Sequence, residues 1–305
     1  MKKLLLGVLI IGGAFAFYAC SQRSGSIDTI VLKSNAVALI TADTKMDNAV
    51  VTAGYESDIF SLGSGSIAIY SAGLKSADMG GGMYRNMFDH FPKFKLHYRY
   101  GFCPDLNVVT TNGGYPKTMT LDYGDSLQLE NGHILSGKII IVISAAPFKS
   151  SSTQSVTFVN FCNDSVCISG TSVKTRTKDP EIKFTENGDL TITLADGTTI
   201  HRVEVNEKTW MAGTETEFDP SDDMTVTTTG QVIVTDSKGN SYSKIITVPL
   251  IKTGECKFIS SGIIEYKDSS GKFATVDYGN GTCDNKATRT TQDSTTVISL
   301  GRERR

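Results

Sequence analysis

The six cysteines of this 305-residue chain are the residues whose spacing most clearly predicts a reaction, the formation of disulfides. Cys256 and Cys283 lie at equal distances from the turn Asp268–Gly271, which separates two segments with the alternating pattern of strands. An antiparallel hairpin would bring these cysteines together, because facing residues lie about 4.5–5.5 Å apart. We therefore predict a Cys256–Cys283 disulfide, whose loop of about 28 residues would stabilise the fold by about 3 kcal/mol.

Cys162 and Cys167 bracket the polar turn Asn163–Val166 and predict a second, short-range disulfide. If Cys20 is modified in another way, this pairing leaves Cys103 without a partner. Metal binding is the alternative chemistry for cysteines. No pair has the two-residue spacing of zinc sites and no histidine lies near either pair, so the spacing favours disulfides over a metal site.

A group of carboxylates in the segment 218–224 is the other candidate for a metal site. Asp219, Asp222 and Asp223 have the density of oxygen ligands that calcium binds. The spacing of an EF-hand and its terminal glutamate are absent, so a solvated turn is the simpler interpretation. We expect no cofactor and keep these three residues only as calcium candidates.

Two short motifs could supply a nucleophilic serine. Gly124–Leu127 spells the signature of the GDSL esterases, in which a late Asp-x-x-His completes the catalytic triad. Here Ser126 follows a mid-chain strand and the sequence has no Asp-x-x-His, so the base that would activate the serine is missing. Ser269 and Lys272 match a Ser-x-x-Lys motif but lie in a predicted hairpin turn instead of at the start of a helix. We therefore assign no catalytic residue.

The start of the chain has the pattern of a secretory signal. Two lysines precede the apolar run Leu4–Phe17, and Cys20 follows the small residue Ala19. The run is shorter than the roughly 20 residues of a transmembrane helix. Its end resembles a bacterial lipobox, in which the cysteine receives two acyl chains (such as palmitate) and a stable anchor. We expect a signal peptide over 1–19 and a lipid-anchored tether over 20–35; ordinary cleavage nearby and a retained anchor are the alternatives.

Composition limits the function classes. Hydrophobic residues make up 39% of the chain, which is enough for a core, and the net charge of −2 argues against a nucleic-acid partner. The expected partners are a membrane, reached through the lipid, and a glycan or protein of the envelope.

The segments beyond the tether predict a mainly β fold. Residues 36–100 form an N-terminal region that is partly helical, with room for short helices in 43–72. From Val108 onwards the chain shows strand patterns, and Asn187-Gly188 and Asp196-Gly197 are hairpin signals. We predict antiparallel hairpins and meanders that form sandwich-like or elongated β units, one over 101–180 and one over 181–305 with the C-terminal disulfide hairpin.

Several motifs resemble an uncharacterised family of predicted envelope lipoproteins from Bacteroidota, over about residues 101–300. The quoted motifs are Tyr115–Thr118, Leu121–Gly124, Asn131–His133, Thr209-Trp210 and Asp277–Asn285. The resemblance implies an outer-membrane lipoprotein without an assigned activity. It also implies that a cysteine often follows the first Asp-Tyr-Gly, and the absence of that cysteine here would leave Cys103 unpaired.

The same resemblance implies O-glycosylation, because such bacteria modify Asp-Ser/Thr-apolar sites of exported proteins. Four positions match this sequon: Thr29, Ser126, Ser165 and Ser294.

The sequence as a whole predicts an exported, lipid-anchored envelope protein with a binding or structural role. A subunit of a fimbria-like surface assembly and a glycan or peptide hydrolase are the alternatives. A hydrolase should place two carboxylates roughly 5–10 Å apart in a cleft. An assembly subunit should expose an unpaired edge strand or a detachable terminal strand, whereas a binding module should show a concave or aromatic patch.

Overall fold

The computed structural model describes a helix within residues 43–61 and the region 103–300. The gaps are 44, 45, 48 and 59 in the helix, and 113, 130, 131, 147, 148, 179, 214–223, 255 and 257 in the second region. No helix among these residues is both long and apolar enough to cross a membrane.

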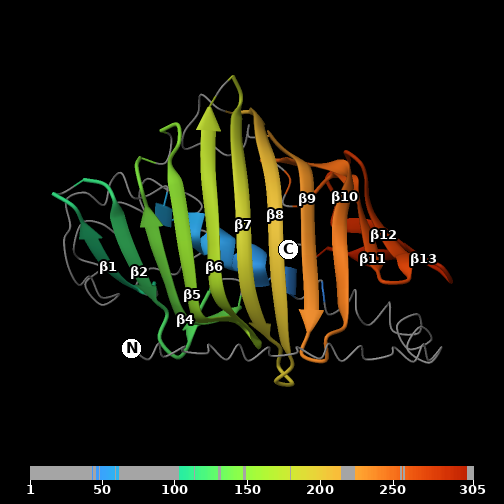
Figure 1. Cartoon of the computed structure of the whole chain (residues 1–305), viewed down its shortest axis with the longest axis horizontal. Coiled ribbons are helices and arrows are strands. Elements are labelled where there is room, and N and C mark those ends of the chain that lie inside the picture. The colour runs from blue at the N-terminus through green and yellow to red at the C-terminus, as the bar shows by residue number, and fades with distance from the viewer. Residues whose placement is uncertain are drawn as a thin grey trace, which may run out of the picture.

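Fourteen strands form one antiparallel sheet in the described region (Figure 1). The strands are β1 (Asp105–Thr110), β2 (Lys117–Asp122), β3 (Leu127–Gln128), β4 (Ile134–Ile143), β5 (Thr153–Asn163), β6 (Val166–Lys178), β7 (Ile182–Thr193), β8 (Thr199–Ala212), β9 (Met224–Asp236), β10 (Ser241–Thr253), β11 (Ser261–Asp268), β12 (Gly271–Asn280), β13 (Lys286–Thr291) and β14 (Thr295–Ser299). Each strand pairs with the next along the chain, except that β2 pairs with β4 and the short β3 pairs beside it on β4. The prediction of a mainly β fold with antiparallel hairpins, meanders and an N-terminal helix is confirmed.

One face of this sheet is covered by the N-terminal helix, which lies behind the strands in Figure 1. Residues alternate between the faces because successive side chains of a strand point to opposite sides. In β4, for example, Leu135, Ile139, Ile141 and Ile143 are buried on the covered face, while Val142 is exposed on the other. Met46 and Phe60 of the helix join the same core cluster. We call the second face the open face, because no described element lies on it.

The hairpin signal at Asn187-Gly188 is wrong, since both residues lie in the middle of β7. The structure gives a physical reason for the glycine. A Cβ atom at Gly188 would lie 2.8 Å from Cγ of Glu204, so the missing side chain makes room for a buried carboxylate on β8. The second signal is right: Asp196-Gly197 forms the β7–β8 turn, with Gly197 at φ 82°.

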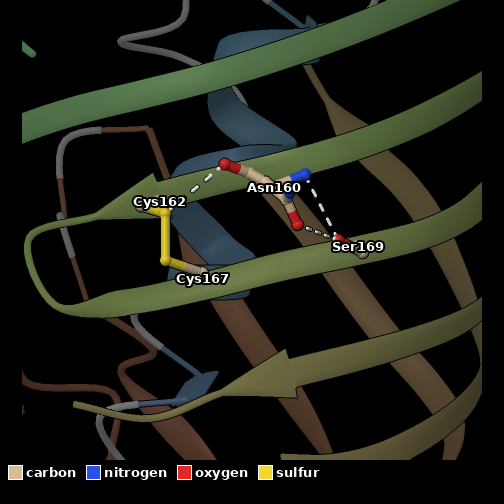
Figure 2. Close-up of a disulfide and its surroundings, with 4 residues drawn as sticks. All are labelled: Asn160, Cys162, Cys167 and Ser169. Atoms are coloured by element: carbon tan, nitrogen blue, oxygen red, sulfur yellow. Dashed lines mark hydrogen bonds between the residues drawn. A yellow bond between two sulfur atoms is a disulfide. The ribbon is translucent and has the colours of Figure 1, made fainter. Parts of the chain in front are cut away.

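The hairpin of β5 and β6 contains the first disulfide close to its turn, where Cys162 and Cys167 face each other directly (Figure 2). Next to it, β5 bulges at Asn160, whose φ of 45° turns its carbonyl toward Gly137 of β4. Ser169 of β6 holds the bulge: its hydroxyl donates to Oδ1 of Asn160 and accepts from the backbone N–H of Asn160 (Figure 2). The 3.4 Å approach of Cys162 Sγ to the Asn160 carbonyl is a packing contact, since a disulfide sulfur carries no hydrogen.

Candidate functional site

A group of ionisable side chains lies between the N-terminal helix and the covered face of the sheet. Asp43, Asp47 and Asp58 are spaced by 4 and 11 residues, which places them along one side of a helix. They contact basic side chains on the covered face of three strands. These are Lys174 of β6, Arg202 of β8 and Lys244 of β10.

Asp43 is fully buried at one end of this contact. The hydroxyl of Tyr242 donates to its Oδ1 at 2.7 Å and the hydroxyl of Tyr266 donates to its Oδ2 at 2.9 Å. The ammonium group of Lys244 lies 3.1 Å from the same Oδ2. Both carboxylate oxygens are therefore engaged by three side chains from β10 and β11.

Asp47 lies one helical turn further on and contacts two cations. Its Oδ1 accepts from Lys244 Nζ at 2.6 Å and from an Arg202 terminal nitrogen at 2.7 Å. Arg202 also donates two hydrogen bonds to Glu204, at 3.0 and 2.8 Å. The side chains of Arg202, Glu204 and Lys244 are only 6%, 6% and 5% exposed, so these charges stabilise one another away from bulk water.

A second ionic group lies beneath the last turns of the helix. Lys174 Nζ donates to both oxygens of Asp58, at 2.7 and 2.8 Å. Glu186 of β7 faces Lys174 across the strands and accepts a hydrogen bond from Lys208 at 3.1 Å. The two groups together extend the ionic contact from β6 to β10.

The environment moves the pKa values of these acids in different directions. Burial and the nearby charge of Asp47 raise the pKa of Asp43 above its ordinary value. Burial would also raise the pKa values of Asp47 and Glu186, but neighbouring cations outweigh it and lower both. Lys244 and Arg202 do so for Asp47, whereas Lys208 and Lys174 bring the pKa of Glu186 to about 2.

The tyrosines of the cluster stay protonated. Burial first, and the charge of Asp43 second, raise the pKa values of Tyr242 and Tyr266, so both hydroxyls remain hydrogen-bond donors to Asp43. The cluster is built to join the helix to the sheet.

A cavity of about 20 Å³ lies between the helix and β5–β8, lined by Ser57, Asp58, Lys174, Glu186 and Glu204 among others. That volume is enough for about one water molecule. It is far below the roughly 300 Å³ at which small-molecule pockets begin.

The described residues contain both predicted disulfides, Cys162–Cys167 and Cys256–Cys283, the latter with a Cα–Cα distance of 5.5 Å. Cys103 is free and 3% exposed, and burial raises the pKa of its thiol, which keeps it protonated.

No cluster of three or more metal-binding side chains occurs in the described part of the chain. The calcium candidates Asp219, Asp222 and Asp223, the lipidation candidate Cys20 and the sequon residue Thr29 lie outside the described residues.

Ser126 is exposed in the turn before β3. The histidine of this hairpin is His133, whose Nδ1 lies 2.6 Å from Asp164 Oδ2. Leu129 faces His133, and Ser126 lies three residues before Leu129, which corresponds to about 10 Å along a strand. The histidine–aspartate pair is therefore out of hydrogen-bond reach of this serine.

The three sequon serines within the described region share one setting. Ser126, Ser165 and Ser294 are all exposed in turns, between β2 and β3, β5 and β6, and β13 and β14. Each hydroxyl is accessible to a modifying enzyme.

Ser269 and Lys272 flank the tip of the β11–β12 hairpin, as predicted, with Asp268 facing Gly271.

The open face carries a small apolar cluster on β8, β9 and β10. Val205 is 50% exposed and Ile233 is 42% exposed. Val203 faces Ile233 directly across the strands, whereas Val205 and Ile245 both face Gln231 and so lie diagonally from Ile233. Facing positions lie about 5 Å apart and diagonal positions about 7–8 Å, so these four side chains form a patch centred on Ile233.

Comparison with known proteins adds no relative. The sequence matches no family model, and neither a curated protein nor a solved structure is significantly similar to it. The functional argument for this chain therefore depends on its own residues.

Proposed function

We propose that this chain is an exported, lipid-anchored protein of the cell envelope that acts as a binding module. The secretory signal with Cys20 supports the anchor. Two disulfides, both in hairpins, suit an oxidising compartment. A lipid on Cys20 would attach the sheet to a membrane through the tether 20–35, and the resemblance to Bacteroidota lipoproteins favours the outer membrane.

The observation that carries the binding role is the apolar patch of Val203, Val205, Ile233 and Ile245. The open-face residues around it are polar, including Asp189, Asn187 and Ser243, and Gln231 lies between Val205 and Ile245. An apolar patch with a polar rim on a rigid sheet is typical of a contact surface for a protein or a glycan.

The terminal strand gives a specific reason to keep the assembly subunit as a second candidate. β14 pairs with β13 alone among the described strands, and its five residues contain no charge and no proline. Val297 is 68% exposed on it. Natural edge strands usually carry charges or prolines that prevent pairing with another chain.

The hydrolase is the least favoured alternative. The carboxylates of Asp43 and Asp47 are close, since both contact Lys244, but they lie on the side of the helix that faces the sheet. Asp43 is 0% exposed and both of its oxygens accept hydrogen bonds from tyrosines. A substrate would have to separate the helix from the sheet to reach both carboxylates.

Site-specific photocrosslinking in living cells separates the first two candidates. A benzophenone residue at Ile233 should give a discrete adduct if the open face binds a partner. The same residue at Val297 is the matched control at the sheet edge. An adduct at Val297 with twice the mass of the chain, and none at Ile233, would replace the binding module by the assembly subunit.

The anchor is tested separately by Cys20→Ser. This variant should lose labelling by an alkyne fatty acid and should leave the membrane fraction. Unchanged labelling would contradict the lipoprotein assignment.

A further inference from the structure

The backbone of β14, at one edge of the described sheet, directs hydrogen-bonding groups away from its neighbour β13. Just past the end of β14, the N–H of Leu300 donates to the carbonyl of Asn285 at 2.7 Å. In an antiparallel ladder, alternate residues of a strand direct both N–H and C=O to the same side. Counted back from Leu300, the N–H and C=O groups of Thr295 and Val297 therefore point outward from the sheet.

This edge carries none of the features that usually prevent pairing with another chain. Edge strands are normally protected by charged side chains, prolines or a covering element. β14 has the sequence Thr-Thr-Val-Ile-Ser and pairs only with β13 among the described strands. Thr295 is exposed and Val297 is 68% exposed. β14 can therefore accept a further strand without a change in the described sheet.

The opposite edge of the sheet is different. β1 pairs only with β2 among the described strands, but it begins with the charged Asp105, directly after Pro104. A head-to-tail contact between β14 and β1 of the next copy would repeat without closing, whereas a contact of β14 with itself closes at two copies. The charge on β1 opposes the first arrangement. The two edges together favour β14 as its own partner.

We propose that β14 pairs with β14 of a second copy, antiparallel and centred on Val297, so that one continuous sheet runs through a symmetric dimer. Val297 would face its own copy and exchange both outward backbone hydrogen bonds with it. Thr295 would face Ser299, which brings two hydroxyl side chains together, and Thr296 would face Ile298. No pair in this register places like charges opposite each other. The contact lies at the sheet edge and the apolar patch lies on β8, β9 and β10, so the dimer goes beyond the binding role proposed above and does not depend on it.

Single cysteines test the register in the purified full-length chain under mild oxidation. Val297→Cys would place two Cα atoms about 5.5 Å apart, which suits a disulfide. Thr295→Cys lies on the same edge, but its copy would be about 13 Å away along the strand, out of reach. We expect at least tenfold more reducible dimer from Val297→Cys than from Thr295→Cys. Val109→Cys, on β1 and 60% exposed, is the matched control at the opposite edge and should give as little dimer as Thr295→Cys.

Light scattering of the unmodified chain over a range of concentrations tests whether the pairing closes. The expected mass is that of two copies, and Thr295→Lys, which adds a charge to the exposed edge, should reduce it to one copy. Little dimer from Val297→Cys, or equal yields from the three cysteine variants, would overturn the register. A mass of one copy at every concentration, or an unchanged dimer for Thr295→Lys, would overturn β14 as the contact. A mass above two copies would overturn the closed dimer and favour an open assembly.

Discussion

Glu186 on β7 provides a direct test of the ionic contact under the helix. Its side chain is 18% exposed, and Oε2 lies 3.1 Å from Lys208 Nζ. The charges of Lys208 and Lys174 outweigh burial and lower its pKa from the ordinary 4.5 to about 2. At 1.36 kcal/mol per pKa unit, this carboxylate stabilises the folded state by about 3 kcal/mol at neutral pH.

The sign of the pH dependence follows from the direction of this change. A carboxyl whose pKa is lower in the folded state contributes its full stability above pH 4.5 and loses it as the pH falls toward 2. Glu186→Gln removes the contribution at every pH. We therefore expect the variant to be less stable than the parent chain by about 3 kcal/mol at pH 7 and by about 1.5 kcal/mol at pH 3, as measured by urea unfolding followed by circular dichroism.

Asp189→Asn is the matched control on the same strand. Asp189 points to the open face, its side chain is 70% exposed, and it contacts His201. Exposed ion pairs contribute about 0–1 kcal/mol, so this variant should change the stability little at either pH. A loss of less than 1 kcal/mol for Glu186→Gln at pH 7, or an equal loss at pH 7 and pH 3, would refute the assigned role of Lys174 and Lys208.

The remaining predictions concern a glycine in β4 and the C-terminal disulfide. Gly137→Ala should lower the free energy of unfolding by at least about 2 kcal/mol, because a Cβ atom would lie 2.0 Å from the carbonyl oxygen of Asn160. Gly132→Ala has a similar φ of 86° with open space around it and should cost only about 1 kcal/mol; equal losses in thermal unfolding would discount the contact. Replacement of Cys256 and Cys283 by serine should cost about 3 kcal/mol, and peptide mapping that joined either cysteine to a different partner would contradict the pairing.

The alternation of apolar and polar residues was enough to predict the β fold and the C-terminal hairpin. Turn residues Asp268–Gly271 and Asp196-Gly197 lie where the sequence places them. Asn187-Gly188 shows the limit of such signals. Glycine can be required for two different reasons. A turn needs it for its positive φ, whereas at Gly188 it leaves space for the side chain of Glu204. The local sequence does not separate these two cases, because the difference lies in the neighbouring strand.

The ionic contact could not be predicted from local patterns, because its partners are far apart in the chain. Asp43 and Tyr266 are separated by 223 residues, and Asp47 and Arg202 by 155. One signal was present: Arg202 and Glu204 alternate with Val203 and Val205 in β8, so one face of that strand had to be charged. Alternation alone does not tell which of the two faces is buried, and the charged face is the one that lies under the helix.

The burial of that charged face has a consequence for specificity. A purely apolar helix would leave Lys244 without its aspartate partners, whereas Arg202 would keep Glu204. A buried unpaired charge costs several kcal/mol. The cations Lys174, Arg202 and Lys244 therefore favour a helix with carboxylates at the spacing of Asp43, Asp47 and Asp58. On the open face the patch around Ile233 has no such filter, since apolar contact there is limited mainly by shape. The two faces of one sheet therefore differ in chemistry: one contacts the helix through charge, and the other carries the apolar patch on which the proposed binding role depends.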